Sequence, residues 1–231
     1  MGVERVESGI PGLDELIEGG FIKNSMNLIT GQTGTCKTIF CCQFLWQGLQ
    51  NGENVVYITL EESPEDIKSQ ALQLGMDFEK YINEGKCIIE YIYPKSFSDL
   101  DYEIFTKIKQ VNANRFVLDS ITLLGFYMEG AEEKLRDKVF TLMQRLKKHN
   151  ITALIVSEIP EGSNTISRFG FEEFVVDGVI GLHYLEYAAG GTPRSLVIRK
   201  MRRTNHSTNV FSMDVTKDGI KISPLKRGII V

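Results

Sequence analysis

The sequence from Gly31 to Thr38 reads Gly31-Gln32-Thr33-Gly34-Thr35-Cys36-Lys37-Thr38, and it is the best guide to the architecture of this chain. It follows a short apolar run, residues 26–30, and precedes a helix-forming stretch, residues 38–50. A strand, a glycine-rich turn and a helix in this order form the setting of a phosphate-binding P-loop. Backbone N–H groups of the turn and the positive end of the helix would cradle phosphate. The alternative is a glycine-rich turn that only starts a helix.

Two side chains at the end of this segment have expected roles. Lys37 would reach the β- and γ-phosphates of a nucleotide such as ATP, and the Thr38 hydroxyl would ligate Mg²⁺. The pattern G-x-x-x-x-G-K-[ST] asks for Gly where this chain has Cys36. A side chain at that position could crowd the phosphates, although Gly34 leaves the turn some freedom. Cys36 also lies beside Lys37 and at a helix N-terminus, which both favour a reactive thiolate.

Composition and charge narrow the class of protein. The chain has 231 residues, of which 42% are hydrophobic, so it can form one large domain with a sizeable core. A net charge of −4 and a pI near 5.5 argue against a protein that coats nucleic acid non-specifically. No apolar run approaches the roughly 20 residues that span a bilayer, and the first residues lack a signal-peptide core. We therefore expect a cytoplasmic protein without a membrane partner, whose cysteines other than Cys36 are ordinary free thiols.

Apolar runs and helix-forming stretches alternate over most of the chain. Strands are expected at residues 26–30, 54–59, 88–92, 115–119 and 151–156, and helices at residues 38–50, 64–74, 99–110 and 132–149. This rhythm predicts an α/β fold, with a mostly parallel central sheet and helices on both faces. After Asp177 the pattern changes to strands at residues 179–186, 195–201, 208–213 and 219–222, which predicts an antiparallel edge at the C-terminal end. No linker interrupts the sequence, so residues 1–231 are interpreted as a single domain.

Acidic residues follow two of the expected strands. Asp119 ends the run Arg115-Phe116-Val117-Leu118-Asp119, which is typical of a strand whose terminal carboxylate holds the Mg²⁺ shell. Glu61 and Glu62 follow the strand at residues 54–59, again at a carboxyl end, where parallel sheets bind ligands. One of them, preferably Glu61, would orient or deprotonate the attacking water. The alternative is an acidic helix entry before Ser63 and Pro64.

A basic segment, Lys200-Met201-Arg202-Arg203-Thr204-Asn205-His206, follows a late strand. Three interpretations remain open for it. It is a solvated turn, or a set of cations supplied to phosphate in the manner of an arginine finger, or a contact to a nucleic-acid backbone.

Taken together, these motifs resemble the KaiC-like branch of the RecA-type ATPases. The resemblance covers nearly the whole chain. Besides the P-loop it rests on residues 8–16, Gly19-Gly20, Thr59-Leu60-Glu61-Glu62-Ser63, Val117-Leu118-Asp119-Ser120, Val176-Asp177-Gly178-Val179-Ile180, and Lys200-Met201-Arg202 with His206. It implies a RecA-like P-loop fold. One departure besides Cys36 is Asn24, which stands where family members often have Gly, and Asn tolerates a left-handed backbone.

The resemblance also implies roles for individual residues. Glu61 matches the catalytic glutamate, with Glu62 beside it. Lys200 and Arg202 match cations that reach the nucleotide of a neighbouring subunit, and His206 matches a residue lining that shared site. The assembly implied is a hexameric ring with ATP between subunits, which requires a heterologous interface that closes.

Three functions are compatible with this sequence. The first is a Mg²⁺-dependent ATPase that works as a ring. The second is an ATP-gated regulatory module with little turnover, for which Cys36 supplies the reason. The third is a nucleic-acid-handling recombinase paralogue, which the acidic pI makes less favourable. The segment 158–174 could be a mobile loop that faces the pore of a ring, or an ordinary irregular connection.

Overall fold

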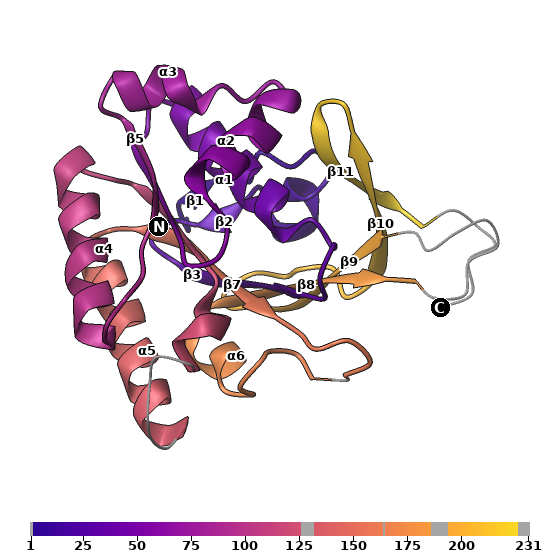
Figure 1. The fold of residues 1–231 in the computed structure, drawn as a ribbon. Helices are drawn as coiled ribbons and strands as arrows, with labels where there is room; N and C mark the ends of the chain where they lie inside the picture. The colour runs from indigo at the N-terminus through magenta and orange to yellow at the C-terminus, as the bar shows by residue number, and fades with distance from the viewer. Residues whose placement is uncertain (1, 126–131, 164, 186–193, 226–231) are drawn as a thin grey trace.

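A nine-stranded sheet forms the centre of the protein, which we describe from a computed structural model for residues 2–125, 132–163, 165–185 and 194–225 (Figure 1). Its strand order is β11-β10-β9-β8-β3-β7-β6-β4-β5. The strands are β3 (Met26–Gly31), β4 (Val55–Thr59), β5 (Cys87–Tyr91), β6 (Arg115–Asp119), β7 (Thr152–Glu158), β8 (Gly178–Tyr184), β9 (Arg194–Met201), β10 (Val210–Thr216) and β11 (Gly219–Pro224).

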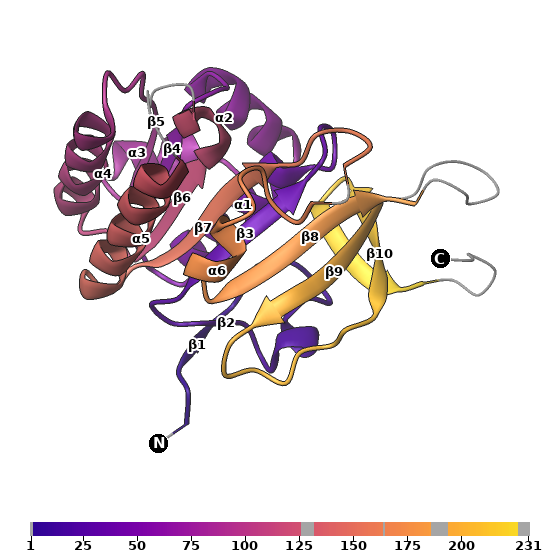
Figure 2. The same cartoon turned by 90° about the horizontal axis from the view of Figure 1, so that it is seen from below.

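The sheet has a parallel part and an antiparallel part. Strands β8, β3, β7, β6, β4 and β5 pair in parallel with their neighbours in this order. Strands β9, β10 and β11 continue the sheet beyond β8 in antiparallel pairs (Figure 2). The predicted architecture, a mostly parallel sheet with an antiparallel C-terminal edge, is confirmed. Residue 186, expected at the end of a strand, lies outside the described residues.

Helices cover both faces of the sheet, as predicted (Figure 1). One face packs against α1 (Lys37–Gln50), α2 (Pro64–Gln73) and α3 (Phe78–Asn83), and the other against α4 (Phe97–Val111), α5 (Glu132–Lys148) and the short α6 (Glu172–Val175). The described chain also contains the 3-10 helices η1 (Asp14–Ile17) and η2 (Ile121–Gly125), and a small sheet of β1 (Arg5–Val6) and β2 (Phe21–Ile22).

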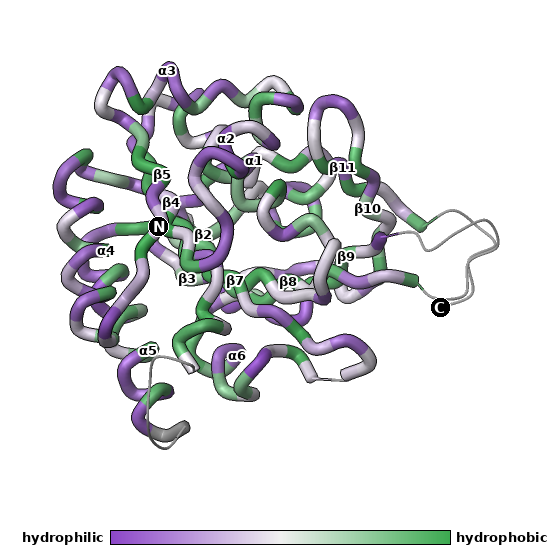
Figure 3. Tube along the Cα trace, in the orientation of Figure 1, coloured by the Kyte–Doolittle hydropathy of each residue, from purple (hydrophilic) through white to green (hydrophobic). Residues whose placement is uncertain are grey.

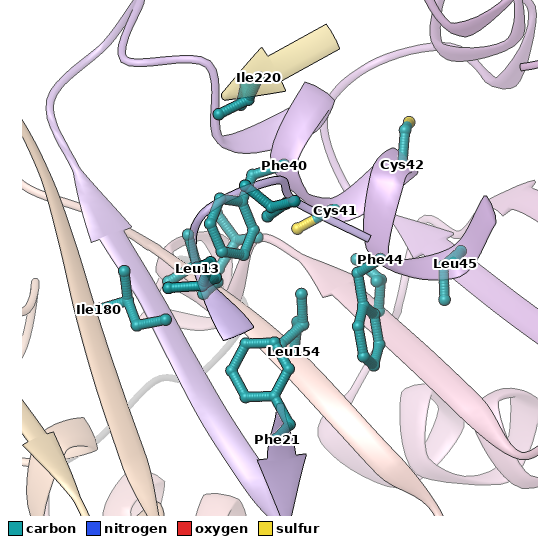
Figure 4. Close-up of a cluster of buried hydrophobic side chains, with 14 of the residues drawn as sticks. Leu13, Phe21, Phe40, Cys41, Cys42, Phe44, Leu45, Leu154, Ile180 and Ile220 are labelled. Carbon is teal, nitrogen blue, oxygen red and sulfur yellow. The ribbon is translucent and has the colours of Figure 1, made fainter. Parts of the chain in front are cut away.

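The core that fixes α1 on the sheet is built from aromatic and aliphatic side chains (Figure 4). Phe40 and Phe44 of α1 are fully buried, and Phe44 meets Phe21 edge to face at 5.7 Å between ring centroids. Burial of one such side chain contributes about 1.5–3 kcal/mol. Figure 3 shows the same pattern along the trace, with hydrophobic colour on the central strands and mixed colour on α4 and α5. Because α1 is held in this way, the turn that precedes it has a fixed position.

Local signals in the sequence explain where several elements begin. The Ser63 hydroxyl accepts the backbone N–H of Asp66, and Pro64 occupies the first helical position, as expected for the start of α2. Asn24 has the left-handed backbone predicted for it, with φ 62°. The sequence prediction missed α3, α6 and the β1–β2 pair, because elements of so few residues lack a readable periodicity.

The parallel register brings the ends of four strands to one edge. Thr59 pairs with Asp119, and Gly31 pairs with Glu158. All four residues end their strands, so the P-loop, the acidic pair after β4 and the acid of β6 meet at the carboxyl edge, where open α/β sheets bind ligands.

Candidate nucleotide-binding site

A cavity of about 250 Å³ opens at this carboxyl edge. It joins the P-loop to the two acidic segments that the sequence analysis selected. The described residues that line it are Thr33, Gly34, Cys36, Lys37, Thr38, Ile39, Glu61, Glu62, Gln70, Asp119 and Glu158. Five of the eight predicted P-loop residues, the two residues predicted for the metal site and the acidic pair therefore line one pocket, whereas Gly31, Gln32 and Thr35 are not among its lining residues.

The side chain of Lys37 folds back onto the P-loop turn that precedes it. Its ammonium group donates to the carbonyl oxygens of Gly31 at 3.1 Å and Gln32 at 3.0 Å. It also lies 3.4 Å from a carboxylate oxygen of Glu158, and the side chain is only 8% exposed. The Thr35 hydroxyl donates to the same Gln32 carbonyl at 2.7 Å, which closes the turn. A buried cation in a loop of backbone amides is an arrangement suited to phosphate.

The tip of the P-loop is held by the hairpin of β8 and β9. Tyr184 donates its hydroxyl to the Gly34 carbonyl at 2.7 Å, and Arg194 donates Nε to the same oxygen at 3.1 Å. A Cβ at Gly34 would stand 2.7 Å from the Tyr184 hydroxyl, and the backbone φ at Gly34 is +77°. Glycine is therefore favoured at this position, because it adopts this conformation without strain and a side chain would have to displace the Tyr184 hydroxyl.

Cys36 occupies a position that favours glycine for a conformational reason. As the residue before α1 it has φ 69° and ψ 34°, which is left-handed. A non-glycine residue in this conformation costs about 1–2 kcal/mol. The expected thiolate character is wrong, because burial raises the pKa of the Cys36 thiol, and this outweighs the lowering by Arg194 and Lys37. The thiol is therefore protonated at neutral pH.

We expect Cys36→Gly to relieve the left-handed strain and to tighten ATP binding several-fold. The gain in free energy of unfolding should stay below about 1 kcal/mol, since glycine also has greater freedom in the unfolded chain. Calorimetric titration with ATP and thermal unfolding measure the two effects. Cys36→Ala is the matched control, because it removes the sulfur but keeps Cβ, and it should bind ATP like the parent. Equal ATP affinities for Cys36→Gly and Cys36→Ala would show that Cβ does not obstruct the phosphates.

Asp119 and Thr38, the two residues expected from the sequence to hold a metal ion, lie side by side. The Thr38 hydroxyl lies 3.4 Å from Oδ2 of Asp119, and the Tyr57 hydroxyl donates to the same oxygen at 2.6 Å. Burial raises the pKa of Asp119 to about 6, while the hydrogen bond from Tyr57 and the charge of Lys37 oppose the shift. An anionic, buried carboxylate beside a hydroxyl offers the oxygen ligands that Mg²⁺ prefers.

Glu61 and Glu62 both line the cavity but are held differently. Ser120, the residue after the acid of β6, donates its hydroxyl to Oε1 of Glu61. Partial burial raises the pKa of Glu61, which the hydrogen bond from Ser120 partly offsets. The backbone carbonyl of Glu62 accepts the Thr59 hydroxyl at 3.0 Å, and no hydrogen bond of its carboxylate occurs among the described residues. The carboxylate fixed in place is thus Glu61, the one preferred from the sequence.

The charges around the cavity are unbalanced. Four carboxylates line it, those of Glu61, Glu62, Asp119 and Glu158, against the one ammonium of Lys37 among the described lining residues. A polyphosphate that enters this cavity would meet net negative charge. Additional cations are therefore required for tight binding, either a divalent metal ion or basic side chains from outside the pocket.

Lys200, Arg202 and His206 lie away from this cavity within the same chain. Lys200 donates to the carbonyl oxygens of Glu173 and Val176, both at 2.7 Å. Arg202 contacts Oδ1 of Asp177 at 3.4 Å and the Phe174 carbonyl at 3.3 Å. The half-buried His206 has Nδ1 3.0 Å from the Ser207 carbonyl.

The register of the sheet explains this separation. Met201 pairs with Gly178, which pairs with Asn27 at the start of β3. The P-loop begins at the other end of β3, roughly 13 Å further along the strand at about 3.3 Å per residue. Lys200 and Arg202 thus lie at the opposite end of the strands from the P-loop of the same chain.

Several residues of this site were missed from the sequence. Glu158, Tyr57, Ser120, Tyr184 and Arg194 all contact residues of the P-loop or of the acidic segments. Ser120 follows a selected acid and could have been found from its place after the strand. Nothing in the local pattern distinguishes Tyr57 from a core residue, or Tyr184 and Arg194 from ordinary strand residues.

Comparison with known proteins agrees with this geometry. The family model described as "ATPase: KaiC" matches residues 6–227. The chain belongs to the KaiC family of ATPases. It is therefore an ATP-binding protein of RecA-like fold, as the resemblance in its motifs implied.

Individual relatives support the same assignment. A UPF0273 protein of Pyrococcus furiosus is 35% identical, with 98% of each chain covered. The circadian clock protein KaiC3 of Synechocystis is 33% identical over 97% of this chain, which spans 46% of that protein. A crystal structure of a KaiC-like protein from Pyrococcus horikoshii shares 39% identity at a TM-score of 0.88, covering 96% of this chain and all of the other.

Among the described residues, none of the helices is long and apolar enough to cross a bilayer.

Proposed function

We propose that this protein is a Mg²⁺-dependent ATPase in which Lys37 binds the nucleotide phosphates, Thr38 and Asp119 hold the metal ion, and Glu61 activates water. The observation that carries this proposal is the convergence of all four side chains on one cavity at the carboxyl edge of the sheet. Backbone amides of residues 31–36 would complete the phosphate site.

The proposal of Mg²⁺ follows from the charge balance of the cavity. Lys37 is outnumbered by carboxylates, so ATP alone would be repelled. Thr38 and Asp119 would hold a divalent ion, which would reduce the repulsion between a polyphosphate and the carboxylates and would supply electrostatic stabilisation in phosphoryl transfer. Tyr57 would hold the Asp119 carboxylate in place through its hydrogen bond to Oδ2.

Replacement of Lys37 by alanine tests whether the cavity is the ATP site. Lys37→Ala should weaken ATP binding by about 10–100-fold, since a hydrogen bond to a charged group contributes about 1.5–3 kcal/mol. The measurement is calorimetric titration with ATP and Mg²⁺. Lys37→Met keeps most of the apolar stem and should lose the same affinity. Lys23→Ala, which removes an exposed lysine paired with Glu4, is the matched control and should leave ATP affinity unchanged. Unaltered affinity in Lys37→Ala would refute the assignment of the site.

The proposed assembly is a ring, with a hexamer as the expected form, in which Lys200, Arg202 and His206 reach the nucleotide of a neighbouring subunit. Two observations support it. These residues lie at the far edge of their own sheet, and the carboxylate-rich cavity needs cations from outside. An interface that joins the far edge of one subunit to the P-loop of the next would satisfy both.

Mixing two inactive variants tests this shared site. Arg202→Ala keeps an intact P-loop and Glu61, whereas Glu61→Gln keeps an intact Arg202. At a mixed interface the cavity of the first would receive Arg202 of the second, so part of the ATP turnover should return on mixing. Phosphate release measures the turnover, and native mass measurement in the presence of ATP gives the assembly. No recovery from a mixture that forms mixed rings, or full turnover by a proven monomer, would rule out action between subunits.

A further inference from the structure

A second polar cavity, of about 200 Å³, lies on the opposite face of the sheet from α1. It is bounded by three strands and by the segment between β7 and α6. Its described lining residues are Thr30 of β3, Gly181 and His183 of β8, Arg199 of β9, and Ser163, Thr165 and Ile166 of the connecting segment. None of these residues carries a carboxylate.

Arg199 supplies an uncompensated positive charge to this cavity. Its side chain is exposed, and the guanidinium makes no hydrogen bond or ion pair with any described residue. The β8–β9 ladder shifts register at Val179 and Ile180, which pair with Lys200 and Ile198, so Arg199 is the extra residue of a β-bulge. Bulges turn a side chain out of the regular alternation and recur beside functional sites.

The other polar groups around the cavity include donors. His183 folds over Gly181, where a Cβ would stand 2.6 Å from its Nε2, and that nitrogen is buried without a hydrogen-bond partner among the described residues. Burial and the charge of Arg199 lower the pKa of His183, so its ring is neutral at pH 7 with one N–H donor. The hydroxyls of Ser163 and Thr165 lie 2.8 Å apart at the rim.

We propose that this cavity is a binding site for a phosphate-like oxyanion, held by Arg199 together with His183 and the hydroxyls of Ser163 and Thr165. A guanidinium fork matches two oxygens of a tetrahedral phosphate, and the hydroxyls and imidazole can donate to the others. None of the described lining residues is acidic, so an anion in this cavity meets no lining carboxylate, in contrast to the carboxylate-rich cavity at the P-loop. The anion is either free phosphate or a phosphate group of a single-stranded nucleic acid.

The site is connected to the P-loop through two short paths. Thr30 directly precedes Gly31, and its hydroxyl donates to the Ile166 carbonyl at 2.6 Å. The segment that carries Ser163, Thr165 and Ile166 begins after Glu158, the partner of Lys37. Occupancy of the second cavity would therefore fix the segment that directly follows Glu158, a residue lining the nucleotide site.

The test uses the full chain carrying Lys37→Ala, so that phosphate binding at the P-loop is weakened. Inorganic phosphate is titrated at constant ionic strength while the ring ¹H–¹³C signal of His183 is followed, assigned by its loss in His183→Gln. A saturable shift of this signal is expected, with no shift of His149, whose ring packs on Phe105. Absence of a saturable His183 shift would overturn the proposal.

Two variants of Arg199 test whether phosphate binding depends on the residue at the β-bulge. Arg199→Ala should weaken phosphate binding by about tenfold or more, and Arg199→Lys, which keeps the charge but not the fork, by less. Arg136→Ala removes an exposed arginine of α5 and should have no effect. Wild-type phosphate affinity in a folded Arg199→Ala chain would also overturn the proposal. If Arg199→Ala does not fold, the phosphate affinity of Arg199→Lys provides the same test.

A comparison of two ligands identifies the source of the anion. If a single-stranded oligonucleotide shifts the His183 signal at a lower concentration of phosphate groups than inorganic phosphate does, the ligand is nucleic acid. If inorganic phosphate acts at the lower concentration, the ligand is the free anion.

Discussion

Glu61→Gln should reduce ATP turnover by about 10²–10⁴-fold, the range contributed by one positioned general acid or base. ATP affinity should remain close to that of the parent, because a group that positions water acts mainly in the transition state. Glutamine preserves the size of the side chain and still offers Ser120 an oxygen acceptor, so the local fold should be retained. Single-turnover phosphate release with preformed ATP complex separates the chemical step from binding.

Glu62→Gln is the control for this experiment. It lines the same cavity and changes the same charge, but no hydrogen bond to Ser120 holds its carboxylate. We expect a loss of turnover below about tenfold, from the altered electrostatics alone. A large loss in Glu62→Gln with normal turnover in Glu61→Gln would reverse the two roles. Normal turnover in both would mean that neither carboxylate activates water.

The part of the site that could be predicted from the sequence rests on spacing and on strand ends. Lys37 and Thr38 follow from the glycine-rich turn, and Asp119 from its place at the end of an apolar run. Parallel strands bring their carboxyl ends together whatever their exact order in the sheet, so the approach of Thr38 to Asp119 needed no knowledge of the register. The antiparallel edge could be predicted from a different signal, the short strands joined by tight turns after Asp177.

The missed residues depend on long-range register. The apolar run of β7 was expected to end at Val156, but pairing with β3 continues to Glu158, which is how this acid comes to face Lys37. Tyr184 reaches the P-loop across a sequence separation of 150 residues. In the sequence, Tyr57 has the pattern of a buried core residue of a strand. Only the pairing of β4 with β6 places its hydroxyl beside Asp119. Local pattern carries no information on such contacts.

Asp119→Asn should stabilise the nucleotide-free protein at pH 8 while abolishing the Mg²⁺-dependent part of ATP binding and turnover. The folded chain raises the pKa of Asp119 from the ordinary value of 3.8 to about 6, chiefly by burial. The ionised form is therefore unfavourable in the fold, by up to roughly 3 kcal/mol at 1.36 kcal/mol per pKa unit. Asparagine removes that charge and keeps an oxygen acceptor for the Tyr57 hydroxyl.

The sign of the pH dependence makes this prediction specific. Since the folded pKa is the higher one, the native state binds the extra proton between pH 3.8 and about 6, and stability falls as pH rises through this interval. The gain from Asp119→Asn should be full above about pH 7 and vanish near pH 4. Urea unfolding in EDTA at several pH values measures it. A variant no more stable than the parent at pH 8, or a gain that grows in acid, would contradict burial of the Asp119 charge as the cause.

Asp177→Asn is the matched control because its shift has the opposite sign. Burial raises the pKa of Asp177, but the hydrogen bonds from Lys147 and the Met26 amide and the nearby cations lower it below its ordinary value. Its ionised form stabilises the fold above the unfolded pKa, so Asp177→Asn should lower stability at pH 8. One buried aspartate is thus costly and the other favourable in the same domain. The costly one ends the strand beside the P-loop, as expected of a carboxylate retained for a metal ion rather than for the fold.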